Sequence, residues 1–358
     1  MAKERQDLSQ VNIERSQLAA LLASVCPELQ IDLAGAVALP CLQPHRQRWR
    51  DWLAAEHHAD LDYVTRDPAA REDPLQKNPW ARSVLIFAQR YTKGWAADEA
   101  AVANDASWVD RVAKYARGAD YHDVFLRDIK GVVKHLAAKI PGFTAFASTD
   151  TGPYLEREYA WLAGLGFMGK NSCLIHERLG SGMFLGVALT NLKIEGMPAG
   201  NSPQAEPLYA IVPRRRRVAK TVVPSHCGSC TACLDACPTN ALLPGGGLDA
   251  RSCISTWTIE WQGQAPAERA EEQGGLLFGC DICQAVCPWN QRSYARADEA
   301  PVRAEYEPLL SHSEVDLAQL AVISDDEFRR RFRRTPLWRS HPEGMRRNAK
   351  VVLKNLAD

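Results

Sequence analysis

Eight of the eleven cysteines in this chain of 358 residues lie within one window, residues 227–287. Cytosolic thiols stay reduced, and clustered ones usually bind metal rather than form disulfides. Two runs in the window share a spacing: Cys227-Gly-Ser-Cys230-Thr-Ala-Cys233-Leu-Asp-Ala-Cys237-Pro238 and Cys280-Asp-Ile-Cys283-Gln-Ala-Val-Cys287-Pro288. The first is the C-x-x-C-x-x-C-x-x-x-C-P run of bacterial ferredoxins, whose fourth cysteine ligates the other of two 4Fe–4S clusters.

The second run lacks one ligand, because Leu277 stands where its first cysteine would fall, and Cys253 is the nearest candidate. Exchange of the fourth ligand then assigns two clusters. We expect the first cluster on Cys227, Cys230, Cys233 and Cys287, and the second on Cys237, Cys253, Cys280 and Cys283. The alternative is structural zinc, since C-x-x-C pairs also bind zinc, although zinc gains nothing from the C-P endings. Adjacent clusters conduct electrons, so the sequence predicts a part in a low-potential reduction.

Composition excludes several other classes of protein. Hydrophobic residues at 46% and charged residues at 24% are typical of a globular chain and exclude disorder, collagen and coiled coil. There is no apolar run of about 18 residues, which a membrane span would need. The start, MAKERQDLSQ, has no apolar core of a secretory signal. We therefore expect a cytoplasmic protein that has no membrane partner and is a monomer. Disulfides rarely form in the cytoplasm, which again favours metal binding by the cysteines.

The chain divides into four expected parts: residues 1–195, a linker or insertion at 196–224, a ferredoxin-like domain at 225–295, and a helical basic segment at 296–358. In the first part, apolar runs predict strands at 34–39, 83–88, 143–148 and 183–189, and helical periodicity predicts helices at 10–24 and 128–140. The linker range is rich in Pro and Gly and contains Arg214–Arg217. The fold expected is an α/β (α+β) domain followed by the two-cluster domain and a helical tail.

The C-terminal tail carries segregated charge. From Arg329 to Asp358, ten Lys and Arg residues stand against two acids, a net charge of +8, although the whole chain sums to zero. Such a segment favours a polyanionic partner, with a solvated helix face as the alternative.

A glycine-rich string, Gly164-Leu-Gly166-Phe-Met-Gly169-Lys170-Asn171, matches two nucleotide-binding patterns incompletely. A dinucleotide fingerprint follows a strand, whereas residues 156–163 predict a helix. A P-loop requires Ser or Thr after its lysine, and here Asn171 stands there. Both nucleotide interpretations are therefore weak, and a glycine-rich turn that lets the backbone approach a large ligand remains open.

Taken together, several motifs resemble the epoxyqueuosine reductase family. They are Asp150-Thr-Gly-Pro153-Tyr-Leu-Glu156-Arg157, the glycine-rich string, the ferredoxin run, Cys253-Ile-Ser255, Tyr121-His122 and Arg347-Asn348-Ala349. The resemblance spans most of the chain in the same order. It implies a cobalamin-dependent iron–sulfur enzyme that removes the epoxide oxygen of epoxyqueuosine at the tRNA wobble position. Residues 1–195 would then bind cobalamin, and the tail would contact the anticodon stem-loop.

The resemblance also implies roles for individual residues. The clusters, reduced by an external low-potential donor, would pass electrons to cobalamin, whose reduced cobalt attacks an epoxide carbon. Asp150 would give the leaving oxygen its proton, which requires a carboxyl pKa raised by its surroundings. The cofactor-binding residues implied are Arg71, Tyr121, His122, Asp150, Lys170, Asn171 and Ser255.

Two departures and two alternatives remain. Phe167-Met168 replaces the family's Trp-containing pair, and Pro198–Thr221 looks like an insertion. A corrinoid reductive dehalogenase also uses cobalamin and two clusters, but such enzymes typically carry a twin-arginine export signal, and MAKERQDLSQ shows none. A plain electron carrier would leave the roughly 200 residues before the clusters without a role.

Overall fold

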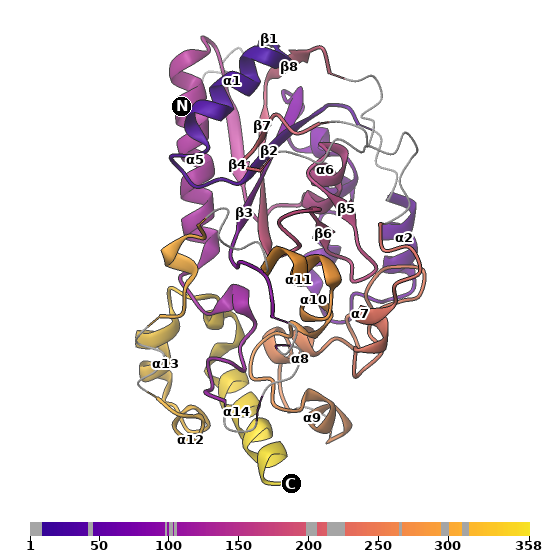
Figure 1. The fold of residues 1–358 in the computed structure, drawn as a ribbon, viewed down its shortest axis with the longest axis vertical. Helices are drawn as coiled ribbons and strands as arrows, with labels where there is room; N and C mark the ends of the chain where they lie inside the picture. The colour runs from indigo at the N-terminus through magenta and orange to yellow at the C-terminus, as the bar shows by residue number, and fades with distance from the viewer. Residues whose placement is uncertain are drawn as a thin grey trace, which may run out of the picture.

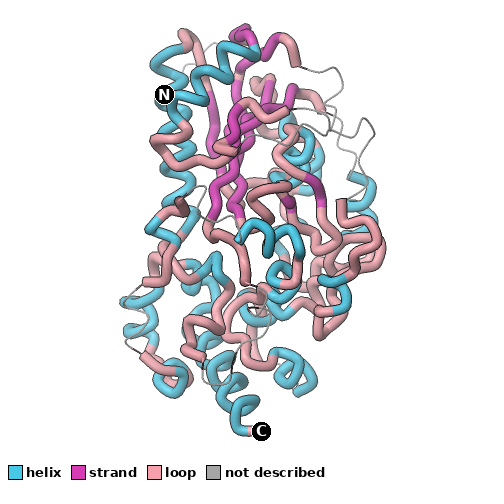
Figure 2. The backbone as a smooth tube through the Cα atoms, viewed as in Figure 1, coloured by secondary structure: helices cyan, strands magenta, loops and turns pink. Residues whose placement is uncertain are grey.

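The computed structural model describes residues 9–41, 46–96, 99, 103, 106–197, 206–212, 226–264, 267–294, 301–309 and 315–358. Strands gather in one half of the molecule and the tail helices lie at the other end, with the cluster segment between them (Figure 1 and Figure 2). Among these residues, no helix is both long and apolar enough to cross a membrane. The expected mixed α/β fold with a C-terminal helix is confirmed.

The larger half is built on a five-stranded antiparallel sheet of order β4-β7-β3-β2-β9. Two smaller pairs flank it, parallel β1-β8 and antiparallel β5-β6. The strands are β1 Val11–Glu14, β2 Leu33–Ala38, β3 Ser83–Arg90, β4 Ala145–Ser148, β5 Phe167–Met168, β6 Leu174–Ile175, β7 Met183–Thr190, β8 Leu192–Glu195 and β9 Tyr209–Ala210.

Helices cover both faces of this sheet (Figure 1). Every residue of β3 is buried, and its side chains alternate between two cores. Leu85 and Phe87 face α1 (Arg15–Val25) and α5 (Tyr121–Lys139), whereas Val84 and Ile86 face α6 (Glu156–Leu162). A central strand that is buried along its whole length, with an unbroken apolar run from Val84 to Ala88, is typical of a sheet covered on both sides.

Two expectations differ from the structure. The helix expected at 10–24 begins only at Arg15, because Val11 and Ile13 pair with β8 and extend the chain there. Within the expected linker at 196–224, residues 196–197 and 206–212 are described, and Tyr209–Ala210 forms the edge strand β9 beside β2. The arginines 214–217 and the rest of the 198–221 stretch lie outside the described residues.

The remaining helices belong to the cavity rim, the cluster segment and the tail. They are α2 Arg46–Ala54, α3 Asp62–Thr65, α4 Pro68–Glu72, α7 Ala232–Asp235, α8 Ile254–Ile259, α9 Ala267–Gln273, α10 Ile282–Ala285, α11 Pro288–Tyr294, α12 Leu317–Leu320, α13 Asp325–Phe332 and α14 His341–Ala357, with short 3-10 turns η1 Pro74–Gln76, η2 Lys114–Ala116, η4 Ala304–Tyr306 and η6 Pro336–Ser340. The tail shares a core with the segments around Trp108 and Phe278, through Phe328, Phe332 and Met345.

Most cations of the tail form ion pairs or hydrogen bonds with other residues of the chain. Three acids just before the counted range, Asp325, Asp326 and Glu327, pair with cations of α13 and α14, and Arg339 pairs with Glu260. Arg347 is buried and donates to the carbonyl oxygens of Trp257, Trp261 and Gly263. The exposed cations that form no ion pair with a described residue are Arg333, Arg334, Lys350 and Lys354. The surface charge is therefore smaller than the sequence count.

Candidate active site

Asp150 stands in the turn that joins β4 to α6. Its backbone adopts φ +56°, in the left-handed region that Asp and Asn tolerate better than most residues. Glu156, in the first turn of α6, accepts the Asp150 backbone N–H at 2.9 Å. The strained turn is thus anchored by the helix that follows it, and the carboxylate is left free to face the N-terminal end of α5.

Two side chains from the start of α5 contact the Asp150 carboxylate. The Tyr121 hydroxyl donates to Asp150 Oδ2 at 2.6 Å, and His122 Nε2 lies 3.4 Å from the same oxygen. His122 Nδ1 lies 2.8 Å from Asp120 Oδ1, and Asp120 also caps α5 by accepting the His122 backbone N–H. Tyr121 stacks on Phe184 of β7 with 4.1 Å between ring centroids, which fixes its position.

The electrostatics of this group differ from the expectation of a raised carboxyl pKa. Burial raises the pKa of Asp150, but hydrogen bonds from His122 and Tyr121 outweigh it, so the pKa falls below its usual value. The carboxylate is ringed by protein, yet 61% of its side-chain surface is open, and water there weakens the effect of burial. Burial lowers the pKa of His122, whereas Asp120 and Asp150 raise it to about 9. The site therefore pairs a carboxylate with an imidazolium.

Asp150 opens onto a large cavity, about 930 Å³, between the sheet domain and the cluster segment. Four of the residues expected to bind cofactor line this cavity: Arg71, Tyr121, Asp150 and Ser255. His122 is not part of the cavity wall, but it contacts Asp150, which is. Cys253, an expected ligand of the second cluster, lines it as well. One cavity thus joins the acid–base group to the iron–sulfur segment.

Arg71 and Ser172 of the cavity wall each have a buried polar side-chain atom that no described residue bonds. Arg71 Nε and Ser172 Oγ are inaccessible to water and have no hydrogen-bond partner among the described residues. Arg71 is held in place because its guanidinium donates to the Tyr63 carbonyl oxygen at 2.8 Å. Buried donors without acceptors are costly, so they favour a ligand that brings its own acceptors.

The cluster cysteines fall into two spatial sets. Cys227, Cys230, Cys233 and Cys287 line one smaller cavity, about 220 Å³. Cys237, Cys253, Cys280 and Cys283 are neighbours instead: burial raises the pKa of Cys280, and the nearby thiols of Cys253 and Cys237 raise it further, to about 12. Burial likewise raises the pKa of Cys283, with added effects of Cys280 and Cys253. These are the two groupings that the exchange of the fourth ligand predicts.

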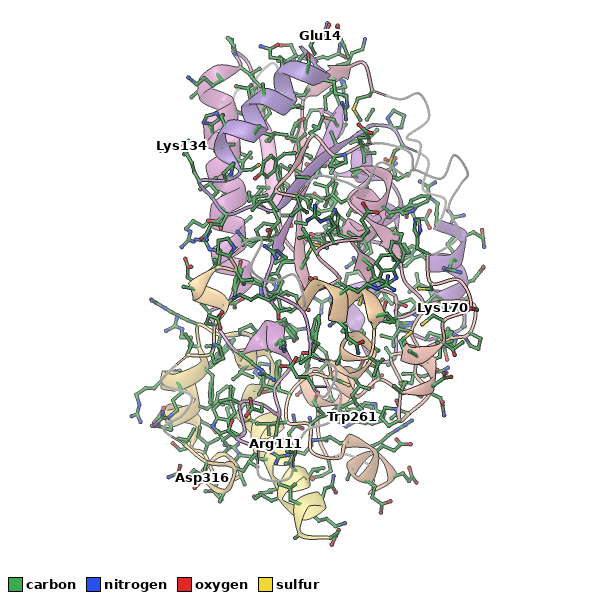
Figure 3. The ribbon with its side chains drawn as sticks, in the orientation of Figure 1. Glu14, Arg111, Lys134, Lys170, Trp261 and Asp316 are labelled. Atoms are coloured by element: carbon green, nitrogen blue, oxygen red, sulfur yellow. The ribbon has the colours of Figure 1, made fainter. Side chains whose placement is uncertain are left out.

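Lys170 and Asn171, which the resemblance assigns to cofactor binding, lie at the turn of the β5-β6 hairpin, against the cluster loops. Lys170 Nζ donates to the carbonyl oxygens of Gly228 at 2.9 Å and Cys230 at 2.8 Å. Asn171 Nδ2 donates to the Cys283 carbonyl oxygen at 3.4 Å. Figure 3 shows Lys170 on the flank opposite Lys134. The hairpin turn therefore connects the loops of both cysteine sets.

The glycines of the glycine-rich string allow the chain to turn after α6 and let the strands of this hairpin approach each other. Gly164 follows the end of α6 with φ +77°, which only glycine adopts without strain. A Cβ at Gly166 would lie 2.5 Å from the Ile175 carbonyl oxygen, so the two strands could not approach. The helix before the string, expected from the sequence, is confirmed as α6 and removes the dinucleotide-binding interpretation.

One part of the cavity wall, formed by α2 and the segment after it, was not predicted from the sequence. Arg48, Trp49, Trp52 and Tyr63 line the cavity. Trp52 Nε1 donates to the Leu248 carbonyl oxygen at 2.5 Å, which holds α2 against the cluster segment. The alternation of Arg and Trp over 46–52 was the available signal, because such patterns are typical of anion- and base-binding surfaces.

Comparison with known proteins assigns the chain to a family. The 4Fe-4S double cluster binding domain matches residues 226–290, and the family described as epoxyqueuosine reductase QueG, DUF1730, matches residues 71–151. The epoxyqueuosine reductase of Gloeobacter violaceus is 37% identical over 310 residues, 86% of each chain. That of Pseudomonas aeruginosa is 32% identical over 316 residues, 88% of this chain and 79% of its own.

This chain belongs to the epoxyqueuosine reductase family. It is accordingly an oxidoreductase with a double 4Fe–4S domain, and the zinc, dehalogenase and plain-carrier alternatives are set aside.

Solved structures of epoxyqueuosine reductases have the same fold. A selenomethionine-labelled epoxyqueuosine reductase superposes with a TM-score of 0.78 at 26% identity, covering 96% of this chain and 83% of that one. An epoxyqueuosine reductase with a tRNA-Tyr epoxyqueuosine-modified stem loop gives a TM-score of 0.77 at 26% identity, with the same coverage.

Proposed function

We propose that this chain reduces epoxyqueuosine to queuosine at the wobble position of tRNA in the cytoplasm. The observation that carries the proposal is the single cavity onto which both Asp150 and Cys253 open. A proton donor and an electron source on one cavity are what reductive removal of an epoxide oxygen requires. The relative solved with an epoxyqueuosine-modified stem loop supports the same substrate.

The large cavity fits cobalamin. Most of its wall area is apolar, and charged side chains from several segments are set among the apolar ones, which suits a large cofactor with both apolar and polar groups. Arg71 Nε and Ser172 Oγ would donate to the amide or phosphate groups of the corrin, with Tyr121 and Ser255 beside them. When bound, reduced cobalamin supplies a cobalt nucleophile for an epoxide carbon.

The positions of the two cysteine sets indicate the direction in which electrons pass through the clusters. Cys230 is exposed, whereas Cys253 lines the large cavity. The first set is therefore the entry side for an external low-potential donor, and the second set lies between the first and the substrate. The β5-β6 hairpin holds both loops at a fixed separation through Lys170 and Asn171.

Asp150 supplies the proton to the leaving oxygen. A carboxylate poised in a strained turn, with Tyr121 and His122 fixing its orientation, can reach a substrate in the cavity. When substrate and cofactor exclude water from the cavity, the carboxyl pKa rises, because burial disfavours the charged form. That rise is what a donor working near neutral pH needs.

Replacing Lys170 with Met tests what Lys170 binds. We expect Lys170→Met to lower the iron content and alter the electron paramagnetic resonance signal of the first cluster, since two hydrogen bonds to its loop are lost. Corrinoid affinity measured by equilibrium dialysis should change less than about twofold. A large loss of corrinoid binding with both clusters intact would instead support the corrin contact that the family resemblance implies.

Arg333 and Arg334 are the tail cations we expect to contact tRNA phosphates. Both are exposed, and the Arg334 carbonyl oxygen accepts the Asp120 backbone N–H at 3.0 Å, next to the start of α5. The double change Arg333→Ala and Arg334→Ala should weaken stem-loop binding and reduce the salt slope by about one unit per contact. Lys350→Ala with Lys354→Ala is the matched control, and an equal loss in both pairs would contradict a localised contact.

The proposed function itself is tested by nucleoside mass spectrometry. tRNA that carries epoxyqueuosine is incubated anaerobically with reconstituted protein, cobalamin and a low-potential reductant. Loss of one oxygen from that nucleoside establishes the reaction. No change, with clusters and corrinoid both verified, would turn attention to small-molecule substrates.

A further inference from the structure

In the resting site the proton is on His122, whereas the proposed reaction needs it on Asp150. Asp150 must give up a proton, yet the contacts of His122 and Tyr121 keep it ionised. His122, by contrast, is held as an imidazolium, with its pKa raised to about 9. A donor that starts each cycle as a carboxylate needs a neighbouring source of protons.

The geometry around His122 links three groups in a row. Asp120 Oδ1 lies 2.8 Å from His122 Nδ1, and His122 Nε2 lies 3.4 Å from Asp150 Oδ2. One ring nitrogen is thus occupied by Asp120, and the other faces Asp150. A carboxylate on one nitrogen fixes the ring orientation and stabilises the protonated form, as in catalytic Asp–His pairs.

The other groups that face this row do not replace His122 as the source. Tyr121 stacks on the imidazole and already donates its hydroxyl proton to Asp150. In the described structure Glu156 bonds the Asp150 backbone N–H and not its carboxylate, and burial raises the pKa of Glu156 well above the usual value, so that it retains its proton. Arg157 acts only as a positive charge that lowers the pKa of Asp150. The His122 side chain is 35% exposed, so solvent can restore its proton.

We propose that Asp120 is a positioning residue that holds His122 protonated and aimed at Asp150, so that His122 reloads Asp150 with a proton. The proposal rests on the proposed function. The proton leaves His122 Nε2 for Asp150 Oδ2, and Asp150 passes it to the alkoxide oxygen of the opened epoxide. Loss of that oxygen as water takes two protons in all and two electrons, which the external low-potential donor supplies through the clusters. Solvent then reprotonates the neutral imidazole, so that the site returns to its starting charge.

Asp120→Asn separates this role from a structural one. Asn caps helices about as well as Asp, so the start of α5 is retained, and only the charge beside His122 is lost. A hydrogen bond to a charged group stabilises by about 1.5–3 kcal/mol, which converts to about 1–2 pKa units. We therefore expect the pKa of His122, followed by NMR of 13C-labelled histidine, to fall by that amount.

The rate should follow the same shift. With the pKa of His122 one unit lower, its protonated fraction at pH 9 falls from about one half to about one tenth. Single-turnover reduction of the modified tRNA by Asp120→Asn should slow about fivefold at pH 9 and little at pH 6.5, moving the alkaline limb of the profile to lower pH. Asp123→Asn is the matched control, because Asp123 is an exposed acid of the same helical turn.

The outcomes separate the relay from the reaction. An unchanged pKa of His122 in Asp120→Asn, or a lowered pKa without movement of the alkaline limb, overturns the relay while wild-type turnover stands. Absence of wild-type turnover overturns the proposed function and, with it, the relay. A shift in both quantities that Asp123→Asn does not reproduce supports the relay.

Discussion

Asp150→Asn is expected to abolish measurable turnover while the protein keeps its clusters and its corrinoid. Asn tolerates the left-handed backbone at φ +56°, so the turn between β4 and α6 is retained. The amide can still accept the Tyr121 hydroxyl, but it has no carboxyl proton to transfer. Loss of a general acid lowers rates by about 10²–10⁴, measured here as single-turnover loss of oxygen from epoxyqueuosine.

The control for Asp150→Asn is the content of both cofactors. Iron analysis and the visible spectrum of bound corrinoid should match the wild type, because the side chain belongs to neither cysteine set. Turnover at the wild-type rate would remove Asp150 from the donor role and leave it as a capping residue of the turn.

Cys253→Ala has the second largest expected effect. Cys253 is the ligand that no short motif fixes, and the only cluster cysteine among the residues that line the large cavity in the described structure. Without it, we expect iron to fall from about eight to about four atoms per chain and electron delivery to the cavity to cease. The readouts are iron analysis and reduction of bound corrinoid followed by absorbance.

Cys41→Ser is the matched control for Cys253→Ala. Cys41 is partly buried and lies outside both sets. It should retain about eight iron atoms per chain and wild-type corrinoid reduction. Full iron content in Cys253→Ala would assign the eighth ligand elsewhere and remove Cys253 from the electron route.

The sequence alone could predict the features that depend on short-range geometry. Neighbouring cysteines within each run are three or four positions apart, which brings their thiols together. Cys287 joins the first set, and Cys237 and Cys253 the second, across longer separations. The buried strand at Ser83–Ala88 and the helix before the glycine string follow from local periodicity in the same way. The strand Val11–Glu14, by contrast, was wrongly expected to be helical, because its extended form depends on pairing with β8, 181 positions along the chain.

Only the tertiary structure shows the charge states of the site residues and the partners that the polar side chains bind. Asp150 is ionised because folding brings Tyr121 and His122, 29 and 28 positions earlier in the chain, against its carboxylate. Lys170 reaches a cluster loop because a hairpin turn points there, and the tail loses much of its charge to Asp325, Glu327 and Glu260. Residue types and spacings establish which chemistry is present. Charge state and orientation depend on distances between segments far apart in the chain, which the sequence does not contain.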